Sequence, residues 1–171
     1  LTTGKLAVTD IVPMDNNTEK DVLLLAGLAE RRSEHPIARA VLNKAAEFKL
    51  TVPEPDACEI FKGSGIKATC KDKSVIVGNS RLITGEQINI TPAVNEIISR
   101  LENQGKTTLI VVRENPAPAP ILAECPAPVF SPSPKAFGEG GRGWVVGVIG
   151  VTDTIKPQAV EAIQKIKQSG I

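Results

Sequence analysis

Four short segments of this chain hold residues that could form a ligand site. The only histidine, His35, stands in the segment S-E-H-P, and Glu30 precedes it by about one helical turn. Gly63 and Gly65 lack side chains, so a ligand could approach the backbone closely between them. Asn79 follows a glycine at the end of a strand-like run.

Each of these residues also has a purely structural interpretation. A histidine before a helix start can satisfy backbone groups at the helix end, as for His35. Two glycines between strands usually form a tight turn, and so does Gly-Asn after a strand. Taken alone, Glu30 would be a solvated surface acid. No single segment therefore identifies a function.

Helix signals predict how the first of these residues are placed. Thr18 can cap a helix in a capping-box arrangement with Asp21, three residues later. Pro36 fits the first turn of a second helix, because proline has no N–H to leave unpaired there. Residues 31–35 are then the junction between the two helices. A further helix is predicted to open at Thr91 and Pro92.

Strand signals place the glycines and Asn79. The apolar residues change to a period of two from Ala57 onward, which predicts short strands joined by tight turns. The connections are too short for crossovers, so these strands should form an antiparallel meander. The predicted strands are 5–12, 57–62, 66–71, 74–77, 107–113 and 144–151, and a last helix is predicted from Pro157.

Composition excludes several classes of protein. Twenty basic and nineteen acidic residues leave a formal charge of +1, and aromatic residues make up 3%, so nucleic-acid binding is not expected. No run approaches the roughly 18 apolar residues of a membrane span, and no secretory signal is evident. The three cysteines, Cys58, Cys70 and Cys125, form no C-x-x-C pair, which argues against a disulfide framework and against a zinc site.

Residues 115–142 differ from the rest of the chain. They hold seven of its thirteen prolines, followed by a glycine-rich stretch. Such a segment cannot form a central strand or a helix, and it is longer than an ordinary loop. We predict a disordered insertion on a hairpin. A docking site for a proline-recognising partner is the alternative interpretation.

Taken together and in this order, the four segments resemble the nucleotide-binding domain of the heavy-metal-transporting P-type ATPases, the P1B type. The ends of the chain agree with this resemblance. Residues 1–11 are similar to the continuation of the family's phosphorylation signature D-K-T-G-T-L-T, and residues 150–157 are similar to the return into the phosphorylation domain. The resemblance covers nearly the whole chain except residues 115–142.

The resemblance implies an α+β fold, a twisted antiparallel sheet flanked by helices, with short ends of the phosphorylation domain. Residues 1–11 would be the end of that domain and a hinge, and residues 12–150 the nucleotide-binding domain with its insertion at 115–142. Residues 151–171 would be the return hinge and a second end of the phosphorylation domain.

The resemblance also implies roles for the candidate residues. His35 would pack against or orient adenine, and Glu30 would accept a hydrogen bond from its exocyclic amine. Gly63 and Gly65 would let the nucleotide lie close to the backbone, and Asn79 would face the ribose or the phosphates. A buried adenine needs such a few placed polar groups in a largely apolar cleft.

The parent enzyme implied by the resemblance is a translocase that passes the γ-phosphate of ATP to an aspartate in the adjoining domain and so drives metal export. The acceptor aspartate is expected to lie before the first residue of the chain, so the chain should bind ATP or ADP without hydrolysing ATP, and no catalytic residue is expected in it. Mg²⁺ would act in the full enzyme. Metal-selecting residues belong to transmembrane helices, so no metal ligand is expected, and family frequency favours copper(I) as cargo.

The implied setting is the cytoplasmic domain of an integral membrane protein, monomeric in isolation. Its partners would be the phosphorylation and actuator domains of the same enzyme. A non-catalytic interaction module that docks partners through residues 115–142 is the alternative function. The cap of a haloacid-dehalogenase-like phosphatase is a weaker third interpretation, because the sequence has no D-x-D signature.

Overall fold

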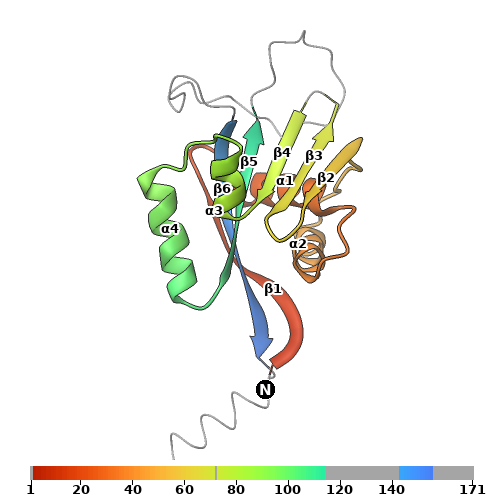
Figure 1. The fold of residues 1–171 in the computed structure, drawn as a ribbon. Helices are drawn as coiled ribbons and strands as arrows, with labels where there is room; N and C mark the ends of the chain where they lie inside the picture. Colours follow the sequence, from red (N-terminus) through yellow and green to blue (C-terminus); the bar gives the residue numbers. More distant parts are fainter. Residues whose placement is uncertain (1, 72, 115–142, 156–171) are drawn as a thin grey trace, which may run out of the picture.

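The computed structural model describes residues 2–71, 73–114 and 143–155 (Figure 1). The predicted insertion at 115–142 and the predicted last helix from Pro157 lie outside these residues. The elements, in chain order, are β1 (Thr2–Pro13), α1 (Glu19–Glu30), α2 (Pro36–Glu47), β2 (Ala57–Phe61), β3 (Gly65–Cys70), β4 (Lys73–Gly78), α3 (Ser80–Gly85), α4 (Pro92–Asn103), β5 (Thr107–Glu114) and β6 (Gly143–Ile155).

The strands form one six-stranded sheet in the order β1-β6-β5-β4-β3-β2, and every neighbouring pair is antiparallel. The predicted meander is confirmed by β2, β3 and β4, which follow one another in the chain and in the sheet. Strands β1 and β6 continue together beyond the rest of the sheet as a two-stranded ribbon (Figure 1). The α+β prediction, an antiparallel sheet flanked by helices, is therefore confirmed.

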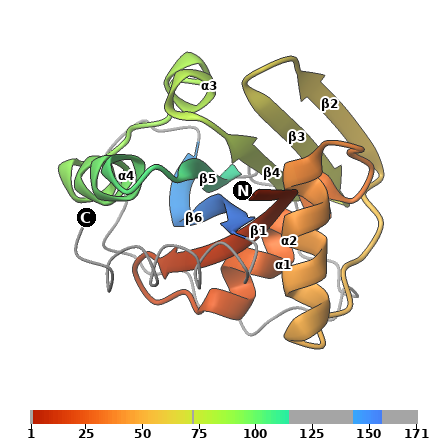
Figure 2. The same ribbon diagram turned by 90° about the horizontal axis from the view of Figure 1, so that it is seen from below.

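Helices cover both faces of the sheet, α1 and α2 on one side and α3 and α4 on the other (Figure 2). Alternate residues of a strand point to opposite faces, so each central strand contributes side chains to two cores, one on each face of the sheet. Val75 and Val77 of β4 pack in the core under α1 and α2. Ile76, between them, packs in the core under α3 and α4. All three side chains are fully buried.

The helix starts predicted at Thr18, Pro36 and Thr91 are confirmed. Thr18 and Asp21 form the capping box of α1, with the Thr18 N–H donating to the Asp21 carboxylate at 2.8 Å. Pro36 occupies the first turn of α2, and Thr91 caps α4. These contacts join residues no more than three positions apart, so the local sequence is enough to predict them.

One helix of the structure is not predicted from the sequence. Gly78-Asn79 is predicted to form a turn, whereas Asn79 caps the short helix α3, which begins at Ser80. The helix is only six residues long, so it shows little periodicity. Its buried residues, Leu82 and Ile83, complete the second core. The longest described helices have 12 residues, and none of them is long and apolar enough to cross a membrane.

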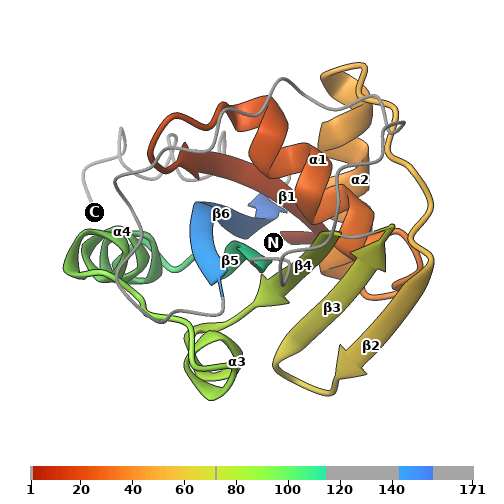
Figure 3. The same cartoon turned by 90° about the horizontal axis from the view of Figure 1, so that it is seen from above.

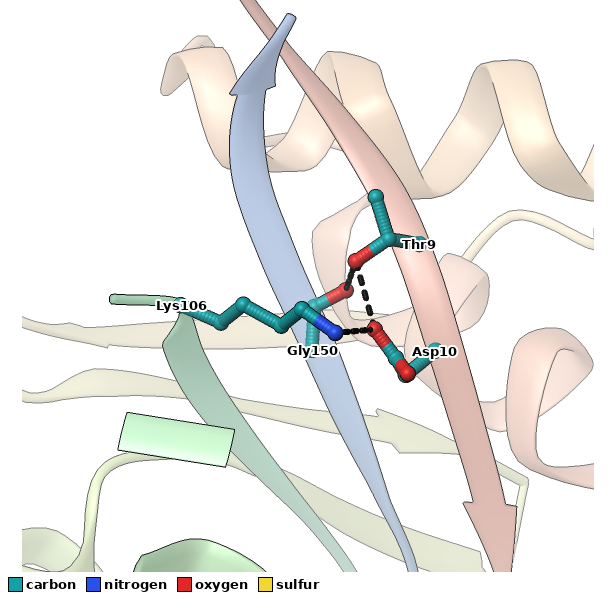
Figure 4. A network of polar contacts seen from close by, with 4 residues as sticks. All are labelled: Thr9, Asp10, Lys106 and Gly150. Atoms are coloured by element: carbon teal, nitrogen blue, oxygen red, sulfur yellow. Dashed lines mark hydrogen bonds and ion pairs between the residues drawn. The ribbon is translucent and has the colours of Figure 1, made fainter. Parts of the chain in front are cut away.

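A polar network joins β1, β6 and the start of β5 (Figure 4). The ammonium group of Lys106 lies 2.6 Å from a carboxylate oxygen of Asp10. The hydroxyl of Thr9 donates to the same carboxylate at 2.6 Å and also lies 3.4 Å from the carbonyl oxygen of Gly150. This cluster ties the end of the α4–β5 connection to the point where the β1–β6 ribbon leaves the sheet.

Candidate functional site

A cleft of about 430 Å³ opens between the junction of α1 with α2 and the β2–β3 hairpin. Figure 3 shows these elements next to one another at one end of the sheet. The cleft brings together all of the residues that the sequence singles out. They are Glu30, His35, Gly63, Gly65 and Asn79.

Glu30 is the last residue of α1, and it is 6% exposed. Burial raises the pKa of its carboxyl group, while a hydrogen bond from Ser33 and the nearby His35 act in the opposite direction. A carboxylate at a helix C-terminus also faces the negative end of the helix dipole. The fold therefore gains little from this acid, which is typical of a residue kept for a ligand.

His35 is the N-cap of α2, and its Nδ1 accepts a hydrogen bond from the N–H of Ile37 at 3.3 Å. The neutral ring then carries its proton on Nε2, and this second nitrogen remains able to donate. The ring is exposed and lines the cleft. The two interpretations of His35 are thus compatible, because the helix cap uses only Nδ1 and the residue still lines the cleft.

Residues 63–65, the glycine turn, form one wall of the cleft. The structure accounts for its two glycines in different ways. Gly63 has φ +72°, and a Cβ atom built there would meet nothing within 4 Å. Gly65 is the first residue of β3, and a Cβ atom there would lie 2.2 Å from the carbonyl oxygen of Val77. Sheet packing alone therefore requires Gly65, whereas Gly63 leaves open space above the turn.

Asn79 holds the glycine turn against the start of α3. Its side-chain oxygen accepts from the N–H of Leu82 at 3.1 Å, and its side-chain nitrogen donates to the carbonyl oxygen of Gly63 at 3.2 Å. The Asn79 N–H also donates to the carbonyl oxygen of Ser64 at 2.9 Å. Much of the hydrogen-bonding capacity of Asn79 is thus used to position the wall of the cleft.

The cleft also contains residues that the sequence analysis did not select. Apolar side chains line much of it, and Ile60, 65% exposed, stands at its edge. Lys62 directly precedes the glycine turn and lines the cleft as well. Its position next to Gly63 in the sequence could have identified Lys62 as a candidate site residue. The remaining lining residues are Ser33, Ile37, Phe61, Ser64, Ile66, Thr107, Thr108 and Leu109.

The donor set of the cleft does not suit a resident metal ion. Across residues 2–71, 73–114 and 143–155, no group of three or more His, Cys, Asp or Glu side chains could hold one. Glu30 is the carboxylate that lines the cleft, and His35 already uses Nδ1 for the helix cap. Orientation of an organic ligand by hydrogen bonds and apolar contact is the chemistry that this arrangement offers.

Known proteins similar to this chain are metal pumps. No protein-family model matches the chain. It is 36% identical over its full length to a protein of Archaeoglobus fulgidus named as a probable copper-exporting P-type ATPase, of which it covers 17%. A copper-exporting P-type ATPase of Staphylococcus aureus is 30% identical, and a zinc-exporting one of Mycobacterium marinum is 25% identical. The chain thus spans about a fifth or less of the length of these relatives.

The solved structures similar to this chain are also parts of P-type or CPx-ATPases. A zinc-transporting PIB-type ATPase matches 99% of the chain with a TM-score of 0.71 and 26% identity, over 22% of that protein. The isolated N-domain of a copper-transporting P-type ATPase matches 84% of the chain with a TM-score of 0.55 at 21% identity, over 97% of that domain. The catalytic domain of the CPx-ATPase CopB-B, described as changing conformation upon nucleotide binding, has a TM-score of 0.54 at 19% identity.

The sheet order and the covering helices match the fold of the N-domains of P-type ATPases. Within that class, the chain is similar over its full length to heavy-metal-transporting P-type ATPases.

Proposed function

We propose that this chain binds ATP in the cleft and presents it to a phosphorylatable aspartate outside the chain, as part of a metal-exporting pump. The observation that carries the proposal is the meeting of Glu30, His35, Gly63, Gly65 and Asn79, from four separate segments, around one cleft. The sequence contains no D-K-T-G segment. Phosphoryl transfer depends on an in-line acceptor, so the chain by itself should bind ATP without turnover.

The base would be held between the helix junction and the glycine turn. The carboxylate of Glu30 accepts a hydrogen bond from the exocyclic amine of adenine, and Nε2 of His35 donates toward the base or packs beside it. Gly63 leaves the space that the nucleotide needs above the turn. Asn79 positions that turn and has one amide N–H left for the ribose or the phosphates.

The cargo and the setting belong to this proposal as well. Two relatives with at least 30% identity are named as a probable copper exporter and a copper exporter, which supports copper as the transported metal, although two relatives at 25% are named as zinc and manganese exporters. The chain would be a cytoplasmic domain of an integral membrane pump, working with phosphorylation and actuator domains. Residues 1–11 and 151–171 would connect it to the phosphorylation domain.

Mg²⁺ would arrive with the phosphates of ATP. The described residues offer no cluster that would hold the ion, so this part of the chain contributes no step through it. The alternative function, docking of a partner through residues 115–142, rests on a segment outside the described residues. The similarity to metal pumps over the full chain favours the nucleotide-binding function.

The test is an amide chemical-shift titration of the full chain with ATP and, as a control, with GTP. Guanine presents a carbonyl oxygen where adenine presents its amine, so the Glu30 carboxylate should discriminate against it. We expect ATP to shift the amides of Glu30, His35 and residues 63–65, with GTP much weaker. Absence of shifts at millimolar ATP, or equal shifts with both nucleotides, would reject the adenine site.

A further inference from the structure

Lys62 gives the cleft a feature that adenine recognition does not use. We propose that its ammonium group binds the phosphate chain of the nucleotide and sets a preference for ATP and ADP over AMP and adenosine. This inference rests on the proposed function and extends it to a further specificity-determining residue.

Among the described residues that line the cleft, Lys62 carries the permanent positive charge. Glu30 supplies the negative charge and lies in a different element, at the end of α1. A nucleotide combines a neutral base with a strongly anionic tail. The tail is repelled by Glu30 and attracted by Lys62, so the electrostatics of the cleft favour one orientation, with the base at the helix junction and the phosphates toward Lys62.

Three other lysines of the described residues form ion pairs, Lys44, Lys67 and Lys106. Lys44 pairs with Glu47 at 2.9 Å, and Lys67 pairs with Glu114 at 2.8 Å. Within the described part of the chain, no carboxylate forms an ion pair with Lys62. A cation with no ion-pair partner among the described residues can meet a phosphate without first breaking such a contact.

The backbone at Lys62 is held in place although its side chain is exposed. The N–H of Ser64 donates to the carbonyl oxygen of Phe61 at 2.9 Å and closes the turn around Lys62 and Gly63. The Asn79 side chain holds the carbonyl oxygen of Gly63. The anchored Cα and the flexible four-carbon side chain let one ammonium group reach successive phosphates, so affinity should grow with their number.

The experiment measures dissociation constants of the full chain for ATP, ADP, AMP and adenosine by calorimetry, for the wild type, Lys62→Gln and Lys20→Gln. Lys20 is an exposed lysine near the start of α1, at the opposite end of that helix from Glu30 and away from the cleft, so Lys20→Gln is matched for the loss of one charge. We expect Lys62→Gln to bind ATP about fivefold more weakly, the scale of one exposed ion pair, with less effect on AMP and none on adenosine. Lys20→Gln should match the wild type.

The salt dependence supplies a second readout. The affinity of the wild type for ATP should fall more steeply with salt than that of Lys62→Gln, because screening weakens the contact that the variant lacks. Equal loss of ATP and adenosine binding in Lys62→Gln, or unchanged ATP binding, would overturn the inference about Lys62. Neither result would contradict the proposal that the wild type binds adenine in the cleft. A wild type that binds none of the four ligands would overturn both the inference and the proposed function.

Discussion

The side-chain amide of Asn79 donates to the carbonyl oxygen of Gly63 at 3.2 Å, across 16 positions of sequence. The other end of the same amide caps α3 through the N–H of Leu82. One side chain therefore connects the glycine turn of the cleft to a helix on the edge of the second core. Asn79 would therefore influence nucleotide binding by positioning the turn, whether or not its side chain also contacts the nucleotide.

Substitution of Asn79 separates these two contacts. Asn79→Asp keeps the oxygen that caps α3 but loses the donor to Gly63, and it adds a negative charge near the expected phosphates. We expect stability within about 1 kcal/mol of the wild type and clearly weaker ATP binding. Asn79→Ala should lose about 1–2 kcal/mol of stability, since both contacts vanish. Thermal melts with ATP titrations test this, and wild-type ATP affinity in Asn79→Asp would contradict it.

Replacing His35 can remove the ring without removing the helix cap. Asparagine is a preferred N-cap residue, so His35→Asn should keep α2 capped and the melting temperature close to the wild type. Loss of the contact with the base should weaken ATP binding by roughly 1–3 kcal/mol. His35→Ala is the control, because it should lose both the cap and the affinity. If His35→Asn binds ATP as the wild type does, the ring takes no part in recognition.

The two glycines should respond differently to alanine. Gly63→Ala adds a methyl group into open space at a positive φ, with an expected cost of about 1–2 kcal/mol in stability. A nucleotide lying over the turn would meet that methyl group, so ATP affinity should fall. Gly65→Ala collides with the carbonyl oxygen of Val77 and should be much less stable. Urea unfolding and calorimetry separate the effects, and full ATP affinity in Gly63→Ala would place the nucleotide elsewhere.

Glu30→Gln should stabilise the fold while weakening binding. Burial raises the pKa of Glu30, so the folded state holds its proton more tightly than the unfolded state. The free energy of unfolding of the wild type therefore decreases as pH rises through this raised pKa. We expect Glu30→Gln to be more stable at pH 7, with the advantage vanishing below pH 4.5, the ordinary value of the group. ATP affinity should fall by about 1 kcal/mol as a charge-assisted hydrogen bond becomes neutral. A destabilised variant at pH 7 would refute this account.

The Asp10–Lys106 pair predicts the opposite dependence on pH. The hydrogen bond from Lys106, followed by that from Thr9, lowers the pKa of Asp10. The stability due to the ionised carboxylate is thus present above the ordinary value of 3.8 and is lost as pH falls through the lowered pKa. Lys106→Met should be less stable at pH 7 by up to about 1 kcal/mol, and the difference should disappear in strong acid. Denaturation curves at several pH values measure it, and a constant difference would point to packing instead.

Contacts between near neighbours in the chain are what the sequence by itself determined. Thr18 finds Asp21 three residues away, and Pro36 needs only its own ring to suit the start of α2. The alternation in residues 57–77 likewise predicts the meander, because short turns permit only antiparallel neighbours. Such features cost little chain entropy to form, so they are readable without the fold.

Only the tertiary structure decided which distant residues meet. The packing of the sheet places Lys106 against Asp10, 96 positions away, and directs Asn79 to Gly63. It also requires glycine at position 65, where two strands approach. These contacts depend on strand order and on the helices that cover each face. No local sequence pattern predicts these contacts, because the partner residues come together only once the whole sheet has formed.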